Sequence, residues 1–148
     1  MRTRHATAAD IPDLIAIEKQ AATASHWSTK QYEAAFSRES PARTILIIED
    51  RAGVQGFIVG RALEKEYEIE NVVIAGAARR RGFGTRLVGE FLALARERGA
   101  ETVFLEVRES NAAARRLYEK LTFTESGRRN LYYQRPEEDA IVYQLDFP

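Results

Sequence analysis

Three strand-like segments follow one another between residues 43 and 74, and this run restricts the fold more than any other feature. Arg43–Glu49 (RTILIIE) is rich in β-branched residues, Asp50–Gly53 is a turn, and Val54–Leu63 (VQGFIVGRAL) predicts the returning strand of a hairpin. Because no helical pattern interrupts the run, we expect these strands to lie side by side in an antiparallel sheet.

The third strand pattern, Glu66–Ile74 (EYEIENVVI), changes character along its length. In its first half Tyr67, Ile69 and Asn71 alternate with glutamates, so we expect the two sets to lie on opposite faces. Its second half is continuously apolar, which is typical of a strand that is buried on both faces.

Helical patterns flank this run on both sides. Thr7 is the expected N-cap of a first helix, and Gly99 is placed to end a long helix after the glycine-rich stretch. That helix has one apolar face, made of Leu87, Val88, Phe91, Leu92 and Ala95. The order β-α-α-β-β-β-α-β-α-β-β predicts a single α+β (mixed α/β) domain over residues 1–148.

The composition excludes several classes of protein. Lysine plus arginine and aspartate plus glutamate number 22 each, so the chain lacks the basic excess of a general nucleic-acid-binding protein. The absence of cysteine removes disulfides and thiolate ligands, and His5 and His26 do not stand at metal-ligand spacing, so we expect no metal. Neither an export signal nor a membrane-spanning run is recognisable, so we expect a cytoplasmic protein that binds no membrane.

The segment HWSTKQYEAAF predicts a short second helix. Ser28 stands at its N-cap, and Trp27 before it is placed to form a hydrophobic staple with Tyr32. The same two aromatic side chains could line a substrate groove. Position alone favours packing and leaves both interpretations open.

The stretch ARRRGFGTRL (Ala78–Leu87) predicts an anion-binding loop. Glycine permits close backbone approach, and the following helix presents free N–H groups and the positive end of its dipole. Two nucleotide-binding motifs do not match: counted from Gly76, a Walker loop needs glycine at Arg81, and the dinucleotide fingerprint needs glycine at Leu87. A helix start with a solvated basic turn is the alternative interpretation.

The loop does fit the pattern Arg-x-x-Gly-x-Gly, from Arg79 to Gly84. In this motif and in its order of elements, the chain resembles the GCN5-related N-acetyltransferase (GNAT) superfamily. The resemblance implies acetyl-CoA as co-substrate and a mostly antiparallel sheet, splayed between its fourth and fifth strands, with helices on both faces. It implies that loop amides hold the pyrophosphate and that the fourth strand's end pairs with the pantetheine arm. The implied cofactor-binding residues are Val72, Val73, Ile74, Arg79, Arg80, Arg81, Gly82, Phe83, Gly84 and Thr85.

Three further residues have ordinary explanations when each is taken alone. Glu106 lies on the more exposed face of a predicted strand, Tyr118 lies on the apolar stripe of a helix, and Asn111 stands at that helix's N-cap. Together, however, LEVRESNAAARRLYEKLTF resembles the ribosomal-protein N-terminal-alanine acetyltransferases, a branch of the superfamily. This resemblance implies that Glu106 is the general base, that Tyr118 is the general acid and that Asn111 binds the cofactor.

The resemblance to this branch extends over nearly the whole chain. HWSTKQY and GRRNLYYQRPEEDAIVY are similar to its other segments, which implies substrate-binding roles for Trp27, Tyr32, Tyr132 and Tyr133. The implied partner is a protein or peptide N-terminus, and we expect a monomer or weak dimer.

Elementary chemistry favours an α-amine as the acceptor. Its reference pKa of about 7.7–8.0 leaves a neutral fraction at cellular pH, whereas lysine, at about 10.4, has almost none. Without cysteine a thioester acyl-enzyme is impossible, so direct transfer is the economical mechanism. Three alternatives stay open: acetylation of internal lysines, acetylation of a small amine such as a polyamine or antibiotic, and an acyl-CoA-binding module without catalysis.

Overall fold

The computed structural model describes residues 1–21, 27–37 and 43–148, and its elements follow the predicted order. The strands are β1 (Arg2–His5), β2 (Arg43–Asp50), β3 (Gly53–Leu63), β4 (Glu66–Ile74), β5 (Thr102–Arg108), β6 (Thr124–Tyr133) and β7 (Glu138–Asp146). The helices are α1 (Ile11–Lys19), α2 (Thr29–Ala35), α3 (Phe83–Glu97) and α4 (Ala112–Lys120), with short 3-10 turns η1 (Ala8–Asp10) and η2 (Gly76–Ala78).

All seven strands form one sheet in the order β1-β2-β3-β4-β5-β7-β6. Neighbouring strands are antiparallel except β4 and β5, which run parallel. The β4–β5 pairing covers four residue pairs and ends at Ile69 and Leu105, although β4 continues to Ile74 and β5 to Arg108. The two strands therefore separate in their second halves, which confirms the predicted splay.

A β-bulge lies in β4 where this separation begins. Val59 of β3 pairs with Asn71 and the next residue, Gly60, pairs with Ile69, so Glu70 is the extra residue. Ile69 packs in the core under α3, whereas the Asn71 side chain points to α1 and donates a hydrogen bond to Glu18. The prediction that Ile69 and Asn71 share a face is wrong, because the bulge reverses the alternation between them.

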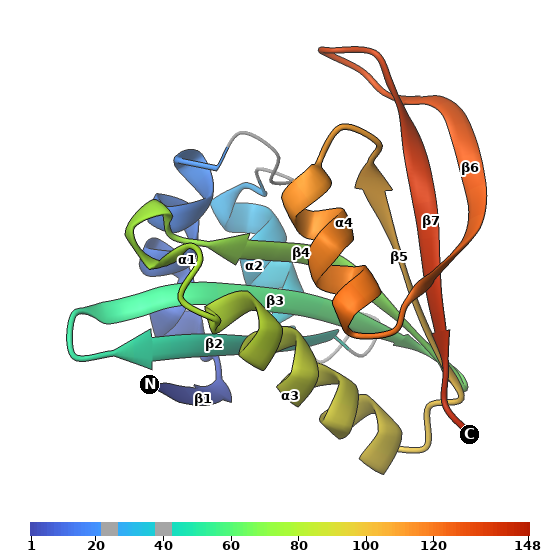
Figure 1. Ribbon diagram of the computed structural model, residues 1–148. Coiled ribbons are helices and arrows are strands. Elements are labelled where there is room, and N and C mark those ends of the chain that lie inside the picture. The colour runs from blue at the N-terminus through green and yellow to red at the C-terminus, as the bar shows by residue number, and fades with distance from the viewer. Residues whose placement is uncertain (22–26, 38–42) are drawn as a thin grey trace.

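Helices cover both faces of the sheet (Figure 1). On one face, α3 and α4 pack over a core that includes Phe91, Leu105 and Tyr118. On the other, α1 and α2 cover a second core around Leu14 and Phe57. The β6–β7 hairpin extends past the rest of the sheet, and its tip lies at the top of Figure 1.

Helix α3 follows the sequence pattern closely. The five residues of its predicted apolar face are all buried. At its end Gly99 has φ +91°, and the N–H groups of Gly99 and Ala100 donate to the carbonyls of Arg96 and Ala95. These two bonds form a Schellman motif, so the predicted helix end is confirmed.

The predicted cap of α2 is confirmed, whereas Thr7 stands at the N-cap of the 3-10 turn η1 and Asp10 at the N-cap of α1. At α2, Ser28 exchanges hydrogen bonds with Gln31, and the rings of Trp27 and Tyr32 lie 5.4 Å apart as a staple. Before η1, the Thr7 N–H donates to the Asp10 carboxylate at 2.7 Å.

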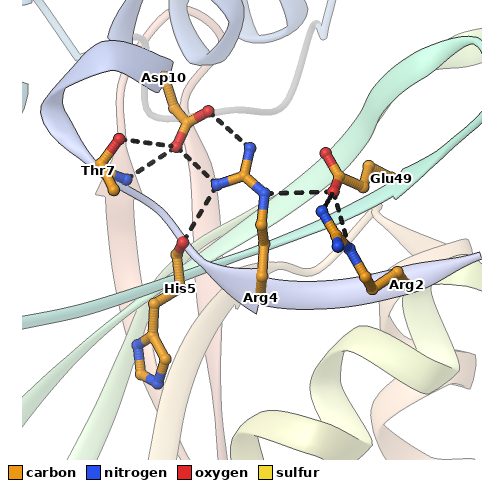
Figure 2. Close-up of polar contacts among 6 residues, drawn as sticks. All are labelled: Arg2, Arg4, His5, Thr7, Asp10 and Glu49. Atoms are coloured by element: carbon orange, nitrogen blue, oxygen red, sulfur yellow. Dashed lines mark hydrogen bonds and ion pairs between the residues drawn. The ribbon is translucent and has the colours of Figure 1, made fainter.

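Arg4 ties β1 to the start of α1 (Figure 2). Its guanidinium donates to both carboxylate oxygens of Asp10, at 2.9 and 3.0 Å, and to Glu49 at 3.2 Å. The hydrogen bond from Arg4 holds the pKa of Asp10 below its ordinary value. Glu49 also pairs with Arg2, so this network joins β1, β2 and η1 at the edge of the sheet.

Gly60→Ala is expected to destabilise the fold. A Cβ at Gly60 would lie 2.2 Å from the ring of Phe91, which is fully buried and has little room to move. We expect the free energy of unfolding to fall by about 1–3 kcal/mol, measured by urea denaturation. Gly89→Ala in α3 is the control: a Cβ there would meet no heavy atom of the described residues within 4 Å, so this variant should gain up to about 1 kcal/mol. Equal stability of Gly60→Ala and the wild type would contradict the packing.

Candidate functional site

The splay leaves one edge of β4 open. The Ala75 N–H donates to the Gln55 carbonyl at 2.8 Å, on the side of β3. Because successive residues of a strand direct their N–H and C=O groups to opposite sides, the backbone groups of Val72 and Ile74 face the opening. An extended ligand with amide groups could hydrogen-bond there as an additional strand would.

The glycine-rich loop joins this strand end to α3 by unusual backbone conformations. Arg80 has φ +64° and Gly82 has φ +81°, both in the left-handed region that favours glycine. The Arg86 N–H donates to the Gly82 carbonyl in the first turn of α3. The N–H groups of Phe83, Gly84 and Thr85 precede that bond and have no acceptor within the helix, so they are available to an anion.

Two of the three loop arginines also contact neighbouring segments. Arg79 Nε donates to the Ile74 carbonyl at 3.4 Å, which ties the loop to the end of β4. Arg81 stacks 4.8 Å from the centre of the Phe83 ring and lies 3.8 Å from Asp50. The arginines therefore leave the loop positively charged. Their contacts also fix the loop to the end of β4, to the start of α3 and to Asp50.

Glu106 lies on β5 beyond the last β4–β5 pair. Val103, Leu105 and Val107 are buried in the core under α3 and α4, so Glu106 faces the α1–α2 side. Its side chain is 21% exposed, and its Oε1 lies 3.0 Å from Nε of Arg129 on β6. Our sequence reasoning missed Arg129, although alternation in GRRN would have placed its two arginines on opposite faces.

Tyr118 lies on the other side of β5. It is 6% exposed and packs against the rings of Phe123 and Tyr143, at centroid distances of 5.6 and 6.3 Å. Burial raises the pKa of its hydroxyl, so the phenol keeps its proton at neutral pH. Glu106 and Tyr118 thus lie on opposite faces of the sheet.

The two hairpin tyrosines lie near Glu106. Arg108 stacks 4.4 Å from the ring centre of Tyr133, and burial followed by the charge of Glu106 raises the pKa of Tyr133 to about 12. The charge of Glu106 also raises the pKa of Tyr132, which is half exposed. Leu131 before them has φ +49° at a shift in the β6–β7 register, and its N–H donates to Asp139.

Two further carboxylates that sequence reasoning missed, Glu68 and Glu70, lie on β4. Arg61 lies 3.4 Å from Glu68, and Arg43 lies 2.8 Å from Glu70. Burial is the main cause that raises the pKa of Glu68; Arg61 opposes it, while the charges of Glu70 and Glu106 add to it. Glu106 is therefore close enough to β4 for its charge to influence the Glu68 carboxyl group. The alternation of glutamates with apolar residues in EYEIE is the sequence signal that could have indicated these two carboxylates.

The remaining predicted site residues have structural contacts. Tyr32 is fully buried, and its hydroxyl donates to Glu18 at 2.6 Å, so it lies in the core and offers no surface to an acceptor. Trp27 is partly exposed beneath the guanidinium of Arg43, at 5.4 Å. Asn111 caps α4 by accepting from the Ala114 N–H at 3.2 Å, as its position predicts.

Within residues 1–21, 27–37 and 43–148, no three histidine, aspartate or glutamate side chains gather as metal ligands would. None of the helices in the same part of the chain has the length and hydropathy of a membrane span. His26 lies outside the described residues.

A family model described as "Acetyltransferase (GNAT) family" matches residues 11–123. The chain belongs to this family. It is 33% identical over 138 residues to the [ribosomal protein bS18]-alanine N-acetyltransferase of Salmonella typhimurium. The aligned region covers 92% of this chain and 90% of that protein. The crystal structure of the ribosomal-protein-S18-alanine N-acetyltransferase from Escherichia coli matches with a TM-score of 0.86 at 28% identity, over 98% of this chain and 92% of that one.

The fold is also similar to that of a structure that was solved with acetyl-CoA. The structure of yncA from Salmonella typhimurium, solved with its cofactor acetyl-CoA, has a TM-score of 0.84 at 21% identity, over 100% of this chain and 94% of that one. The matches confirm the GNAT fold, the branch that the sequence resembles and the assignment as an acetyltransferase. GNAT enzymes take their acetyl group from acetyl-CoA, and the roles of individual residues stay predictions.

Proposed function

We propose that this GNAT enzyme, as one domain of residues 1–148, acetylates the α-amine of a protein N-terminus directly from acetyl-CoA. Its main acceptor is the N-terminal alanine of a small-subunit ribosomal protein. The observation that carries the proposal is the splay, with Glu106 on the α1–α2 face and Tyr118 on the α3–α4 face. A carboxylate and a phenol thus flank one opening from opposite sides, as a base and an acid of one transfer reaction should.

The open strand edge and the loop fit the shape of an acyl-CoA. Phosphate oxygens accept hydrogen bonds, and the free N–H groups of Phe83, Gly84 and Thr85 at the start of α3 donate them. The N–H and C=O of Val72 and the N–H of Ile74 face an amide-bearing arm, while the Ile74 carbonyl already accepts from Arg79. Since these groups are backbone atoms, the donor site depends on the path of the chain more than on particular side chains.

The two proposed proton carriers suit the transfer. A bond forms between the acceptor nitrogen and the acetyl carbonyl carbon, and the carbon–sulfur bond breaks. Glu106 takes the proton that the amine loses, and the Tyr118 phenol gives a proton to the departing thiolate. Because the reference pKa of a thiol is about 8.5, the proton from Tyr118 helps the reaction without being essential.

The face of the sheet that bears Glu106 is called the acceptor face here. The charges on this face support a single amine over a polyamine as the acceptor. Glu68 and Glu70 each lie against an arginine. A polyamine binds best where several carboxylates lack cationic partners. The 33% sequence identity to the Salmonella enzyme, which is named as a ribosomal-protein alanine N-acetyltransferase, also supports the N-terminus of a ribosomal protein as the acceptor.

An acceptor panel tests the proposal. With acetyl-CoA we expect thiol release for a peptide that begins with a free alanine, and little for an N-terminally blocked lysine peptide or for spermidine. In cells that lack the protein, mass spectrometry should find one ribosomal protein without its N-terminal acetyl group. Release with spermidine alone would reject a protein acceptor, and binding of acetyl-CoA without release on any acceptor would support a non-catalytic module.

Glu106→Gln tests the base. We expect kcat to fall about 100-fold or more, because general bases contribute on this scale, while the affinity for acetyl-CoA stays unchanged. The measurement is the rate of thiol release from pH 6 to pH 9. Glu101→Gln is the matched control, because Glu101 is exposed, pairs with Lys65 and lies before the start of β5, away from the hairpin. Equal turnover of Glu106→Gln and the wild type over this range would remove Glu106 from the base role.

Gly82→Ala tests the loop. A side chain at φ +81° costs about 1–2 kcal/mol, so the loop should shift and the Kd for acetyl-CoA should rise about tenfold. Isothermal titration calorimetry measures this change. Gly76→Ala in η2 is the control, since a Cβ there would meet no described atom within 4 Å and should leave the Kd unaltered. An unchanged Kd in Gly82→Ala would contradict the role of the loop.

A further inference from the structure

Arg129 occupies the position at Glu106 that an acceptor ammonium would take. We propose that Arg129 is a specificity-determining residue, which a polypeptide acceptor displaces and a small amine does not. Arg129 thereby selects protein chain ends over free amines. The inference rests on the proposed function and names a residue that sets its acceptor class.

The contact is close but open to solvent. Arg129 Nε lies 3.0 Å from Glu106 Oε1, with exposed fractions of 58% and 21% for the two side chains. The guanidinium also stacks 5.2 Å from the ring centre of Tyr132. An exposed ion pair of this kind contributes little stability, so an incoming ligand can replace it.

The fold does not need this pair to hold the hairpin. The neighbouring Arg128 donates to Glu109 and to Asp139, at 2.8 and 2.7 Å, and Asp139 in turn accepts from the Leu131 N–H. Those bonds join the hairpin to the segment after β5 and close its bulge. Arg129 can therefore leave Glu106 without loss of the hairpin's position.

The chemistry of displacement separates the two kinds of acceptor. A guanidinium has five N–H donors and no acceptor, so after leaving Glu106 it bonds to water or to oxygen atoms that the ligand brings. A polypeptide brings a backbone carbonyl with every residue. A small amine brings its own cation and at most one carbonyl, so the cation lies beside Arg129 at a single carboxylate, and like charges so placed repel.

The hairpin also offers surface to a chain beyond its first residue. Leu131 and Tyr132 are 61% and 49% exposed and follow Arg129 by two and three residues in the sequence. A peptide that contacts these side chains comes within reach of the Arg129 guanidinium. An acceptor that ends after one residue does not extend that far.

The test compares alanine amide with a seven-residue peptide that begins with alanine. Both have an α-amine, so they differ only in chain length. In Arg129→Gln we expect kcat/KM for alanine amide to rise about tenfold, mainly through a lower KM, and kcat/KM for the peptide to change less than about threefold. Arg129→Lys keeps the charge and should keep the wild-type ratio of the two acceptors, as should Arg135→Gln, which removes an exposed charge from the turn between β6 and β7.

Several outcomes would overturn the inference. An unchanged ratio in Arg129→Gln, with both acceptors still acetylated, would reject it and leave the proposed function standing. An equal change of the ratio in Arg135→Gln would assign the effect to hairpin charge in general and would also reject it. If the wild-type protein acetylates neither acceptor but does acetylate lysine or spermidine, the proposed function fails and the inference fails with it.

Discussion

Four residue pairs join β4 to β5, and the site depends on the pairing ending there. If the parallel pairing continued, β5 would satisfy the backbone groups of Val72 and Ile74, and no strand edge would be open to a ligand. The bulge at Glu70 lies directly after the last pair, and bulges bend a strand and increase its twist. The core under α3 and α4 includes side chains of both strands, so they can part at one end without opening the sheet elsewhere.

A buried carboxylate holds the strand just past this bulge. Glu18 is 1% exposed and accepts hydrogen bonds from the Tyr32 hydroxyl at 2.6 Å and from Asn71 Nδ2 at 2.8 Å. A carboxylate without partners in such a place would be strongly unfavourable, so α1, α2 and β4 must keep their spacing. Because Asn71 follows the bulge residue, this network influences the direction in which β4 leaves β5.

Features that depend on one segment's own sequence could be predicted, and those that depend on a partner across the sheet could not. The buried face of α3, the helix end at Gly99 and the outward position of Glu106 follow from local periodicity or backbone geometry. The bulge arises from pairing with β3, so alternation alone misplaced Asn71. Arg129 reaches Glu106 across β7, and the letters GRRN do not say which carboxylate each arginine meets.

If the proposed function holds, the ion pair between Glu106 and Arg129 determines which features of an acceptor contribute to its binding. Glu106 already has a cation beside it, so an arriving ammonium exchanges with Arg129 and does not neutralise a free anion. Most of the Coulomb gain then cancels, because one ion pair is lost as another forms. The positive charge of an acceptor therefore contributes little to its affinity. Backbone carbonyls and side-chain contacts along the hairpin have to supply the difference, and a chain end has these where a free amine has none.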